Sequence, residues 1–533
     1  MKNILRSRAL KIIGLYCSIA IFISAAAIAQ ETIPAQTALN GIDPQTAQAI
    51  ESYVKGKMVK LHSPGMAVGI VKGSTLIYEG YFGWADIEAK KPVGESTIFR
   101  IGSISKTMTT IGLMQQWELG KFKLDDNLNN YFPRPLIFPP HPDTRPVSFR
   151  YLLTHTSGGG EYLTLRQIFT PGLGYIVEGE NYLPLIHYLR FGMKTKYDPG
   201  LKYAYCNYGF AFLGYALENI AKEPFHIYQK KHIFEPLCMR DTDYHHNAQI
   251  MSRLANGYRY KDGRYVLDPH KAIGITPAGS VYTDIREMAL YVTALLNGGK
   301  NENGSVIKPE TLDMLFSTQF TLDPRQAGRG IGFMVFGDNL WGYRVVGHGG
   351  QVPFGFNSEM FLVPGEKVGV IVFSNAGNVA SVETAWGVLK MALDVKDNPP
   401  PEVTPNRKVW PELVGYYRPE YPEFRTDTRL YMSGIGAYRV RRLKNDLVME
   451  YVWQGKKTAK KLHQVGETDP YFFWYDSPND EIRPYVAFKK KENGKMYIIP
   501  GGLNEYVKLG PIRKCKTKMM IPPGRMLDKI NPF

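Results

Sequence analysis

The sequence has few cysteines, and after residue 29 it has no apolar run long enough to cross a membrane. Cys17 lies in an N-terminal apolar segment, which leaves Cys206, Cys238 and Cys515, an odd number spread far apart. This spacing indicates neither a disulfide framework nor a Cys-x-x-Cys metal site, so buried thiols are expected. A membrane helix needs roughly 20 continuous apolar residues, and their absence predicts a soluble mature chain.

Three common catalytic motifs are also absent, namely Gly-x-Ser-x-Gly, His-Glu-x-x-His and Gly-x-x-x-x-Gly-Lys-Ser/Thr. Their absence counts against the α/β-hydrolase nucleophile elbow, a zincin metalloprotease and a P-loop nucleotide site. The chemistry must therefore be sought in other residues, and neither a metal nor an organic cofactor is expected.

Acidic residues are scarce at the C-terminal end of the chain. The whole chain has a formal net charge of +16, and residues 401–533 contain 25 Lys and Arg against 15 Asp and Glu. Because the excess is confined to the last quarter, nucleic acid is not expected as a substrate. The basic region could contact an anionic surface such as cell-wall polymer or lipid headgroups, or could serve solubility alone.

Residues 1–29 have the pattern of a secretory signal peptide. Basic residues at positions 2, 6, 8 and 11 precede the apolar stretch 12–23, and Ala27-Ile28-Ala29 forms a small-x-small cleavage site. The pattern predicts export, and hence a periplasmic or secreted protein. An uncleaved N-terminal anchor is the alternative.

The remaining length exceeds what one core usually holds, which predicts two domains. We expect one domain over residues 30–397, a proline-rich linker over 398–410 and a basic module over 411–533. Short aromatic and β-branched runs predict that this module is a small all-β, barrel-like unit; they are residues 447–453, 471–475, 485–488 and 496–499.

The larger domain has strand patterns at both of its ends and helices between them. An amphipathic helix over 44–60 precedes a hairpin of strands 65–71 and 75–78, and a second periodic helix covers 288–296. Four more strands and a closing helix are expected at 331–336, 343–346, 358–363, 368–373 and 382–393. The order predicts an α+β fold in which both ends of the domain build one antiparallel sheet, faced by a helical insertion.

Ser103 and Lys106 are the first candidate site residues. Ser103 begins a helical pattern, and residues three apart lie on one helix face, so the Lys106 amine falls within reach of the Ser103 hydroxyl. A serine needs such a base to become a nucleophile. Ser-x-x-Lys also occurs at Ser52 and Ser305, so a helix-capping serine beside a solvated lysine is the alternative.

Tyr205-Cys206-Asn207 is a rarer pattern, because Tyr205 alone among the 34 tyrosines is followed by asparagine two residues later. A tyrosine hydroxyl near a lysine ammonium loses its proton more easily and can shuttle it. The Asn207 amide can both donate to and accept from a substrate. A packed aromatic followed by a turn asparagine is the alternative.

His348-Gly349-Gly350 completes the set. The two glycines would let a substrate lie close to a strand edge, and the Gln351 N–H could pair with the Ser103 N–H as an oxyanion hole. His348 could donate a proton or a hydrogen bond near the bound group. The alternative is a tight turn that exposes a histidine.

With these motifs in this order, residues 45–395 resemble the superfamily of serine β-lactamases and penicillin-binding proteins, in its branch of class C β-lactamases, D,D-carboxypeptidases, D-aminopeptidases and esterases. Leu152 to Gly158 and Pro199-Gly200 also look like family segments. The resemblance implies that Ser103 is acylated, that Lys106 and Tyr205 transfer its proton, and that His348 stands where many β-lactamases have lysine. His155 is expected to be structural.

The predicted function is therefore that of an exported serine hydrolase acting through an acyl-enzyme on amide or ester bonds of a small molecule or peptide. Because a histidine is mostly neutral near pH 7, peptidase or esterase activity is favoured over β-lactam hydrolysis. Cys206 also departs from the serine that is frequent in the family. The rival hypothesis is a non-catalytic receptor for cell-wall peptide or penicillin.

Overall fold

The computed structural model describes residues 33–159, 176–177, 181–337, 340, 342–396, 403–419, 438–453, 456–476 and 482–509. The predicted signal peptide, residues 398–402 of the predicted linker, and Cys515 lie outside these residues. Among the helices that are described, none combines the length and apolar character needed to span a bilayer.

An antiparallel sheet forms the centre of the N-terminal domain, and it is built from both ends of that domain. Its spatial order is β1-β3-β2-β17-β16-β15-β14-β13, with β4 beside β3. In this order the strands are Ala35–Leu39, Thr75–Asp86, Gly65–Lys72, Val368–Ser374, Phe356–Val363, Val346–Val352, Met334–Val335 and Gly328–Arg329, and β4 is Lys91–Pro92. The predicted α+β architecture is confirmed.

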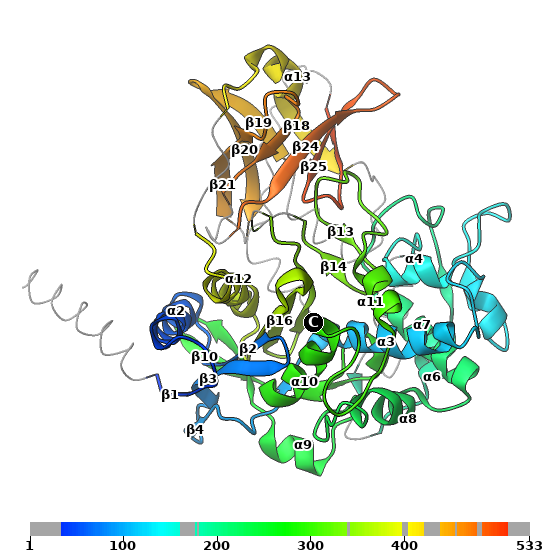
Figure 1. The fold of residues 1–533 in the computed structure, drawn as a ribbon. Helices are drawn as coiled ribbons and strands as arrows, with labels where there is room; N and C mark the ends of the chain where they lie inside the picture. Colours follow the sequence, from blue (N-terminus) through cyan, green and yellow to red (C-terminus); the bar gives the residue numbers. More distant parts are fainter. Residues whose placement is uncertain are drawn as a thin grey trace, which may run out of the picture.

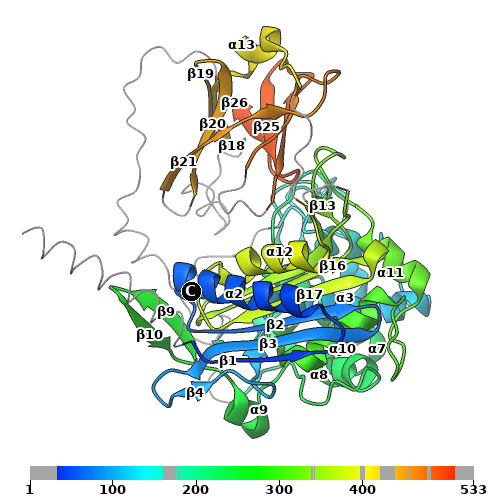
Figure 2. The ribbon, with the colours of Figure 1, turned by 60° about the vertical axis from the view of Figure 1, so that its left-hand side comes forward.

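Helices cover both faces of this sheet, as Figure 2 shows. On one face α2 (Pro44–Leu61) and α12 (Ala380–Ala392) bury an apolar core against the strands. On the other face a larger core joins the sheet to α3 (Ser105–Glu118), α7 (Asn207–Ala221) and α10 (Ile285–Leu296). Shorter helices complete this layer; they are α4 (Phe149–Leu153), α6 (Leu185–Leu189), α8 (Phe225–Gln229), α9 (Ala248–Arg253) and α11 (Pro309–Phe316).

The predicted helices and the hairpin at the domain's N-terminal end are confirmed, but two strand assignments are wrong. The expected strands 331–336 and 343–346 are replaced by the two-residue β14 and by β15, which starts only at Val346. β15 was missed because its Val-Gly-His-Gly-Gly sequence has low strand propensity, whereas its pairing with all of β16 supplies the stability. A hairpin of β9 (Gly257–Lys261) and β10 (Arg264–Asp268) was also missed.

The C-terminal module is a second antiparallel sheet of nine strands that curls into a near-barrel above the first domain (Figure 1). Trp410, at the end of the predicted linker, packs in its core from the short helix α13 (Trp410–Leu413). In spatial order the strands are β21 (Lys456–Lys461), β20 (Asp446–Trp453), β19 (Tyr438–Leu443), β18 (Gly415–Pro419), β26 (Tyr506–Lys508), β25 (Met496–Pro500), β24 (Tyr485–Lys490), β23 (Phe472–Trp474) and β22 (His463–Gln464).

The module docks on a segment of the N-terminal domain that leads directly into β13. The Leu322 N–H donates to the Gly502 carbonyl at 2.8 Å, and the buried Gln326 Nε2 donates to the Ile499 carbonyl at 2.9 Å. Arg325 pairs with Asp469 of the module. Leu322 also packs against an apolar cluster of the module, so the contact combines apolar burial with hydrogen bonds.

Two adjacent glycines test this docking contact. Gly501 and Gly502 have φ of +66° and +82°, so alanine at either position carries a backbone cost of about 1 kcal/mol. Only at Gly502 would a Cβ meet the other domain, at 2.1 Å from the Ala327 carbonyl oxygen. We expect Gly502→Ala to separate the domains, measured as an increased radius of gyration by small-angle X-ray scattering and faster interdomain proteolysis. The matched Gly501→Ala variant should remain docked, and equal behaviour of the two would contradict the contact.

Candidate active site

Ser103 lies in a short helical turn, η1 (Gly102–Ile104), that runs directly into α3. The turn follows β5 (Phe99–Arg100), which pairs with β12 (Tyr282–Thr283) and so fixes where the helix starts. Backbone N–H groups in a first helical turn have no acceptor within the helix. The Ser103 side chain is partly exposed, so a nucleophile at this position can be reached from solvent.

Lys106 is completely buried and joins three separate segments of the chain. Its Nζ lies 2.9 Å from Ser103 Oγ, 2.6 Å from Asn207 Oδ1 and 2.5 Å from the Ala278 carbonyl oxygen. The last two atoms can only accept hydrogen bonds, so two N–H groups of the amine must point at them. The remaining direction on Nζ faces Ser103: an ammonium donates along it, and a neutral amine accepts the serine proton there.

Tyr205 and Asn207 reach the same point from the start of α7. The Tyr205 ring centroid lies 4.9 Å from Lys106 Nζ, and Asn207 is the first residue of the helix. His155 supports this segment: its ring stacks on Tyr205 at 4.2 Å, and its Nδ1 accepts the Cys206 N–H at 3.1 Å. Burial, together with the Arg329 and Lys106 charges, holds the pKa of His155 well below its usual value, so the ring is neutral. His155 thus positions the tyrosine without adding charge.

His348, Gly349, Gly350 and Gln351 lie within β15 and not in a turn, and this strand packs beside Ser103. Ser358 of the neighbouring β16 donates to the Ile101 carbonyl at 2.7 Å and thereby ties the sheet to the turn that carries Ser103. The backbone of Gly350 passes so close to Ile101 that a Cβ at residue 350 would lie 1.9 Å from the Ile101 oxygen.

His348 was expected to donate a proton or a hydrogen bond to a bound group, and its protonation state in the structure differs from that expectation. Burial and the Lys106 charge lower its pKa from 6.5 to about 3, so the imidazole is neutral. Its Nδ1 lies 2.6 Å from the Gly349 carbonyl, which can only accept, so the ring proton is on Nδ1. The other ring nitrogen, Nε2, then carries a lone pair. At Nε2 the neutral His348 ring can therefore only accept a hydrogen bond.

The structure brings all eight predicted site residues to one place, and it adds residues that the motifs did not reveal. Besides Ser358, these are the Ala278 carbonyl and the buried Arg329, whose guanidinium donates to the Tyr203 hydroxyl. A backbone carbonyl leaves no signal in a sequence, and Arg329 lies outside every motif. The segment Leu152 to Gly158 was the one available signal, and it does place His155 against Tyr205.

The site therefore lies where an antiparallel sheet between two helical layers meets the turn that carries Ser103 and leads into α3. A family model described as Beta-lactamase matches residues 50–392, more than half of the chain. The chain therefore belongs to the β-lactamase family.

Three similar proteins can be compared with this chain. Protein flp of Staphylococcus aureus (strain MRSA252) is 22% identical over 329 residues, which are 62% of this chain and 62% of that protein, so the chain spans less than two thirds of such curated relatives. The octameric penicillin-binding protein homologue from Pyrococcus abyssi superposes with a TM-score of 0.55 at 23% identity, over 86% of this chain and 99% of that one. The D-amino acid amidase from Ochrobactrum anthropi SV3 superposes with a TM-score of 0.52 at 20% identity, over 66% of this chain and 98% of that one.

Two neighbouring glycines of β15 should respond differently to alanine. At Gly350 a Cβ would collide with the Ile101 oxygen at 1.9 Å and would push the strand away from Ser103. At Gly349 it would meet the Glu359 carboxyl at 2.7 Å, on a side chain that can move. We expect Gly350→Ala to lower kcat/KM on an ester substrate at least about 100-fold, as the loss of an oxyanion donor does, and Gly349→Ala to lower it much less. Similar losses in both variants would contradict the proposed approach of the strand.

The depressed pKa of His348 makes a stability prediction with a definite sign. In the unfolded chain the His348 ring binds a proton below pH 6.5. In the folded protein the ring stays neutral down to about pH 3. Stability is therefore lost as the pH falls through this window. Between pH 7 and about pH 4.5 the free energy of unfolding of the wild type should fall by about 2–3 kcal/mol more than that of His348→Gln, measured by urea unfolding. The exposed His141→Gln variant is the control, and equal losses in wild type and His348→Gln would refute the assignment.

Proposed function

We propose that the protein is an exported serine hydrolase that acylates Ser103 and cleaves esters or amides whose leaving group carries no carboxylate. The observation that carries this proposal is the Lys106 amine, held within hydrogen-bond distance of both Ser103 Oγ and Asn207 Oδ1. Membership of the β-lactamase family supports a hydrolase, and the similar fold of a D-amino acid amidase supports amide chemistry.

In the proposed mechanism the Ser103 oxygen attacks the substrate carbonyl as its proton leaves toward Lys106 or Tyr205. Lys106 lies between the hydroxyl and the Tyr205 ring, so its charge would stabilise a phenolate, or its lone pair would take the proton directly. The same groups return the proton to the leaving oxygen or nitrogen. Water then attacks the acyl-enzyme by the reverse path and releases the acid.

Two further elements hold the substrate in this proposal. The N–H groups of Ser103 and Gln351 supply the oxyanion hole, because Ser103 is in a first helical turn and β15 passes directly beside it. The Asn207 amide is oriented by Lys106, which takes its oxygen as an acceptor and thus turns its NH₂ group to the other side. That side can donate to the substrate's acyl part.

His348 supports a preference for substrates without a carboxylate near the cleaved bond. A lysine at this strand position would present a permanent cation, whereas His348 is neutral and directs a lone pair from Nε2. A carboxylate and a lone pair repel each other, but an alcohol, an amine or a primary amide can donate to that nitrogen. Esters, aminopeptidase-type peptides and amides therefore fit better than penicillins or peptides cut next to a free C-terminus.

Export to the periplasm or beyond is part of the same proposal. It is supported by the basic, apolar and small-residue regions of residues 1–29. The substrate would then be a small molecule or peptide of that compartment.

Turnover of a neutral chromogenic ester and of a D-amino acid amide tests the proposed reaction. We expect the wild type to hydrolyse at least one of them with a covalent acyl adduct on Ser103 detectable by mass spectrometry. Ser103→Ala should lose the adduct and at least about 1,000-fold in kcat, since it removes the nucleophile. Binding without turnover in the wild type would favour a receptor and overturn the proposal.

The His348→Lys variant separates the reaction from its substrate preference. It restores a cation at the strand and should raise the ratio of kcat/KM for a cephalosporin over that for the neutral ester by about tenfold or more, the value of one charge-assisted hydrogen bond. An unchanged ratio, with the ester still hydrolysed, would contradict the preference and leave the acyl-enzyme mechanism standing.

A further inference from the structure

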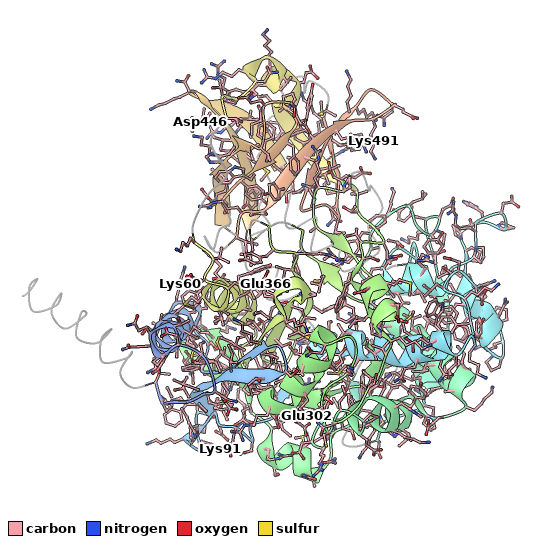
Figure 3. All side chains as sticks on the ribbon, viewed as in Figure 1. Lys60, Lys91, Glu302, Glu366, Asp446 and Lys491 are labelled. Carbon is pink, nitrogen blue, oxygen red and sulfur yellow. The ribbon has the colours of Figure 1, made fainter. Side chains whose placement is uncertain are left out.

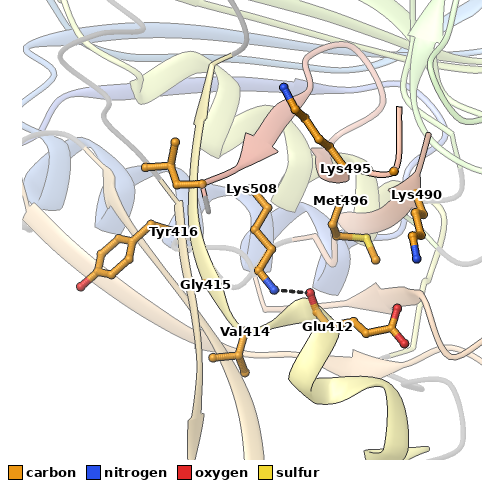
Figure 4. Close-up of a pocket in the computed structure, with 10 residues that line it drawn as sticks. Glu412, Val414, Gly415, Tyr416, Lys490, Lys495, Met496 and Lys508 are labelled. Atoms are coloured by element: carbon orange, nitrogen blue, oxygen red, sulfur yellow. Dashed lines mark hydrogen bonds between the residues drawn. The ribbon is translucent and has the colours of Figure 1, made fainter. Parts of the chain in front are cut away.

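The C-terminal module has a pocket of about 720 Å³ on the side of α13, β18 and the hairpin between β24 and β25 (Figure 4). Its lining combines an apolar part, to which Met496 and Val414 contribute, with lysine side chains. In Figure 4 the side chains of Lys490 and Lys508 lie on either side of that of Met496, and the Lys495 side chain extends away from it. The pocket therefore joins an apolar floor to a cationic rim.

The charges of this pocket are not balanced by acidic residues. Lys490 and Lys495 are exposed, and neither forms an ion pair or a side-chain hydrogen bond in the described part of the chain. Lys508 donates to the Glu412 carbonyl oxygen at 2.6 Å, so its ammonium group is held in place at the edge of the pocket. The Glu412 carboxylate is the one acidic group in the lining, against three cations.

The same end of the module exposes apolar side chains among further cations. Leu443, the last residue of β19 before the turn into β20, is 45% exposed and lies between Arg442 and Lys444. Arg442 reaches the ring of Trp410 in α13, at 5.9 Å, which places this turn beside the helix that borders the pocket. Tyr416, a pocket residue, is 38% exposed. Leucine and tyrosine flanked by basic residues are typical of surfaces that enter a lipid headgroup region.

The position of this end leaves the active site free. The contacts with the N-terminal domain come from Asp469, Phe472, Ile499 and Gly502, at the opposite end of the module. Figures 1 and 3 show α13, Asp446 and Lys491 at the end that points away from the first domain. A surface bound there would not cover the β15 edge.

We propose that this basic end, made of the pocket and the turn around Leu443, binds the headgroup layer of an anionic lipid bilayer, with a lipid phosphate between Lys490, Lys495 and Lys508. The lysines supply attraction to the phosphate groups, and Leu443 and Tyr416 enter the headgroup layer. A wholly polar wall polymer would use the cations but would gain nothing from Leu443. The module thus holds the hydrolase at a membrane surface.

Sedimentation of the full chain with vesicles tests the proposal. At low ionic strength the protein should bind vesicles of equal parts phosphatidylglycerol and phosphatidylcholine, and should not bind vesicles of phosphatidylcholine alone. Each lysine near an anionic surface contributes about fivefold in affinity, so Lys490→Glu/Lys495→Glu should weaken binding at least about 25-fold. The control Lys60→Glu/Lys121→Glu, which changes two exposed lysines of the N-terminal domain, should change binding much less. A thermal unfolding curve of the module variant that matches that of the wild type reports that it is folded.

Two further arms distinguish the sources of negative charge. Leu443→Ser should weaken vesicle binding while leaving any binding to a soluble anionic polymer, polyphosphate, unchanged. Inorganic phosphate at millimolar concentration should not displace the protein from vesicles if the bilayer is the ligand. The proposal is overturned if the protein does not bind the anionic vesicles, or if the two double variants lose vesicle affinity equally. It is also overturned if Leu443→Ser leaves vesicle binding unchanged, or if free phosphate displaces the protein from the vesicles.

Discussion

The arrangement of the site depends on one buried amine. Lys106 is completely buried. Its Nζ is held by Ser103 Oγ in the turn η1, by Asn207 Oδ1 at the start of α7 and by the Ala278 carbonyl oxygen. A buried cation without such partners would cost several kcal/mol, so these segments converge because the amine requires them. The geometry that would support catalysis and the stability of the domain centre are thus the same set of contacts.

The sheet, the helical insertion that faces it and the all-β module could be predicted because helices such as α2 and α10 have apolar periodicity and strands such as β17 are continuous apolar runs. The strand β15 could not be predicted, because its glycines remove the periodic signal and its pairing with β16 determines the structure. The site residues were predicted from one motif that recurs in the chain, one rare motif and one glycine-rich segment, and their convergence was not visible in any single motif. The Ala278 carbonyl and the tautomer of His348 depend on three-dimensional contacts that a sequence does not contain.

The segment of the N-terminal domain that contacts the module is directly connected to the active site. Residues 322–327 contact the module, and the chain then enters β13, where Arg329 donates to the hydroxyl of Tyr203, two residues before Tyr205. The buried guanidinium also contributes to the low pKa of both His155 and His348. The docking contact, the edge of the sheet and the charge behind the catalytic candidates therefore form one continuous structure.

Glu359 lies beneath β15, where its buried carboxyl occupies the space that a side chain at Gly349 would need. Burial raises its pKa well above the usual value, so it is held as a neutral acid. A side chain larger than that of alanine at residue 349 would accordingly require a smaller residue than glutamate at position 359 of the adjacent strand. Enlarging residue 349 is therefore a two-strand problem for protein engineering, because the residue in β15 and the residue that it meets in β16 must change together.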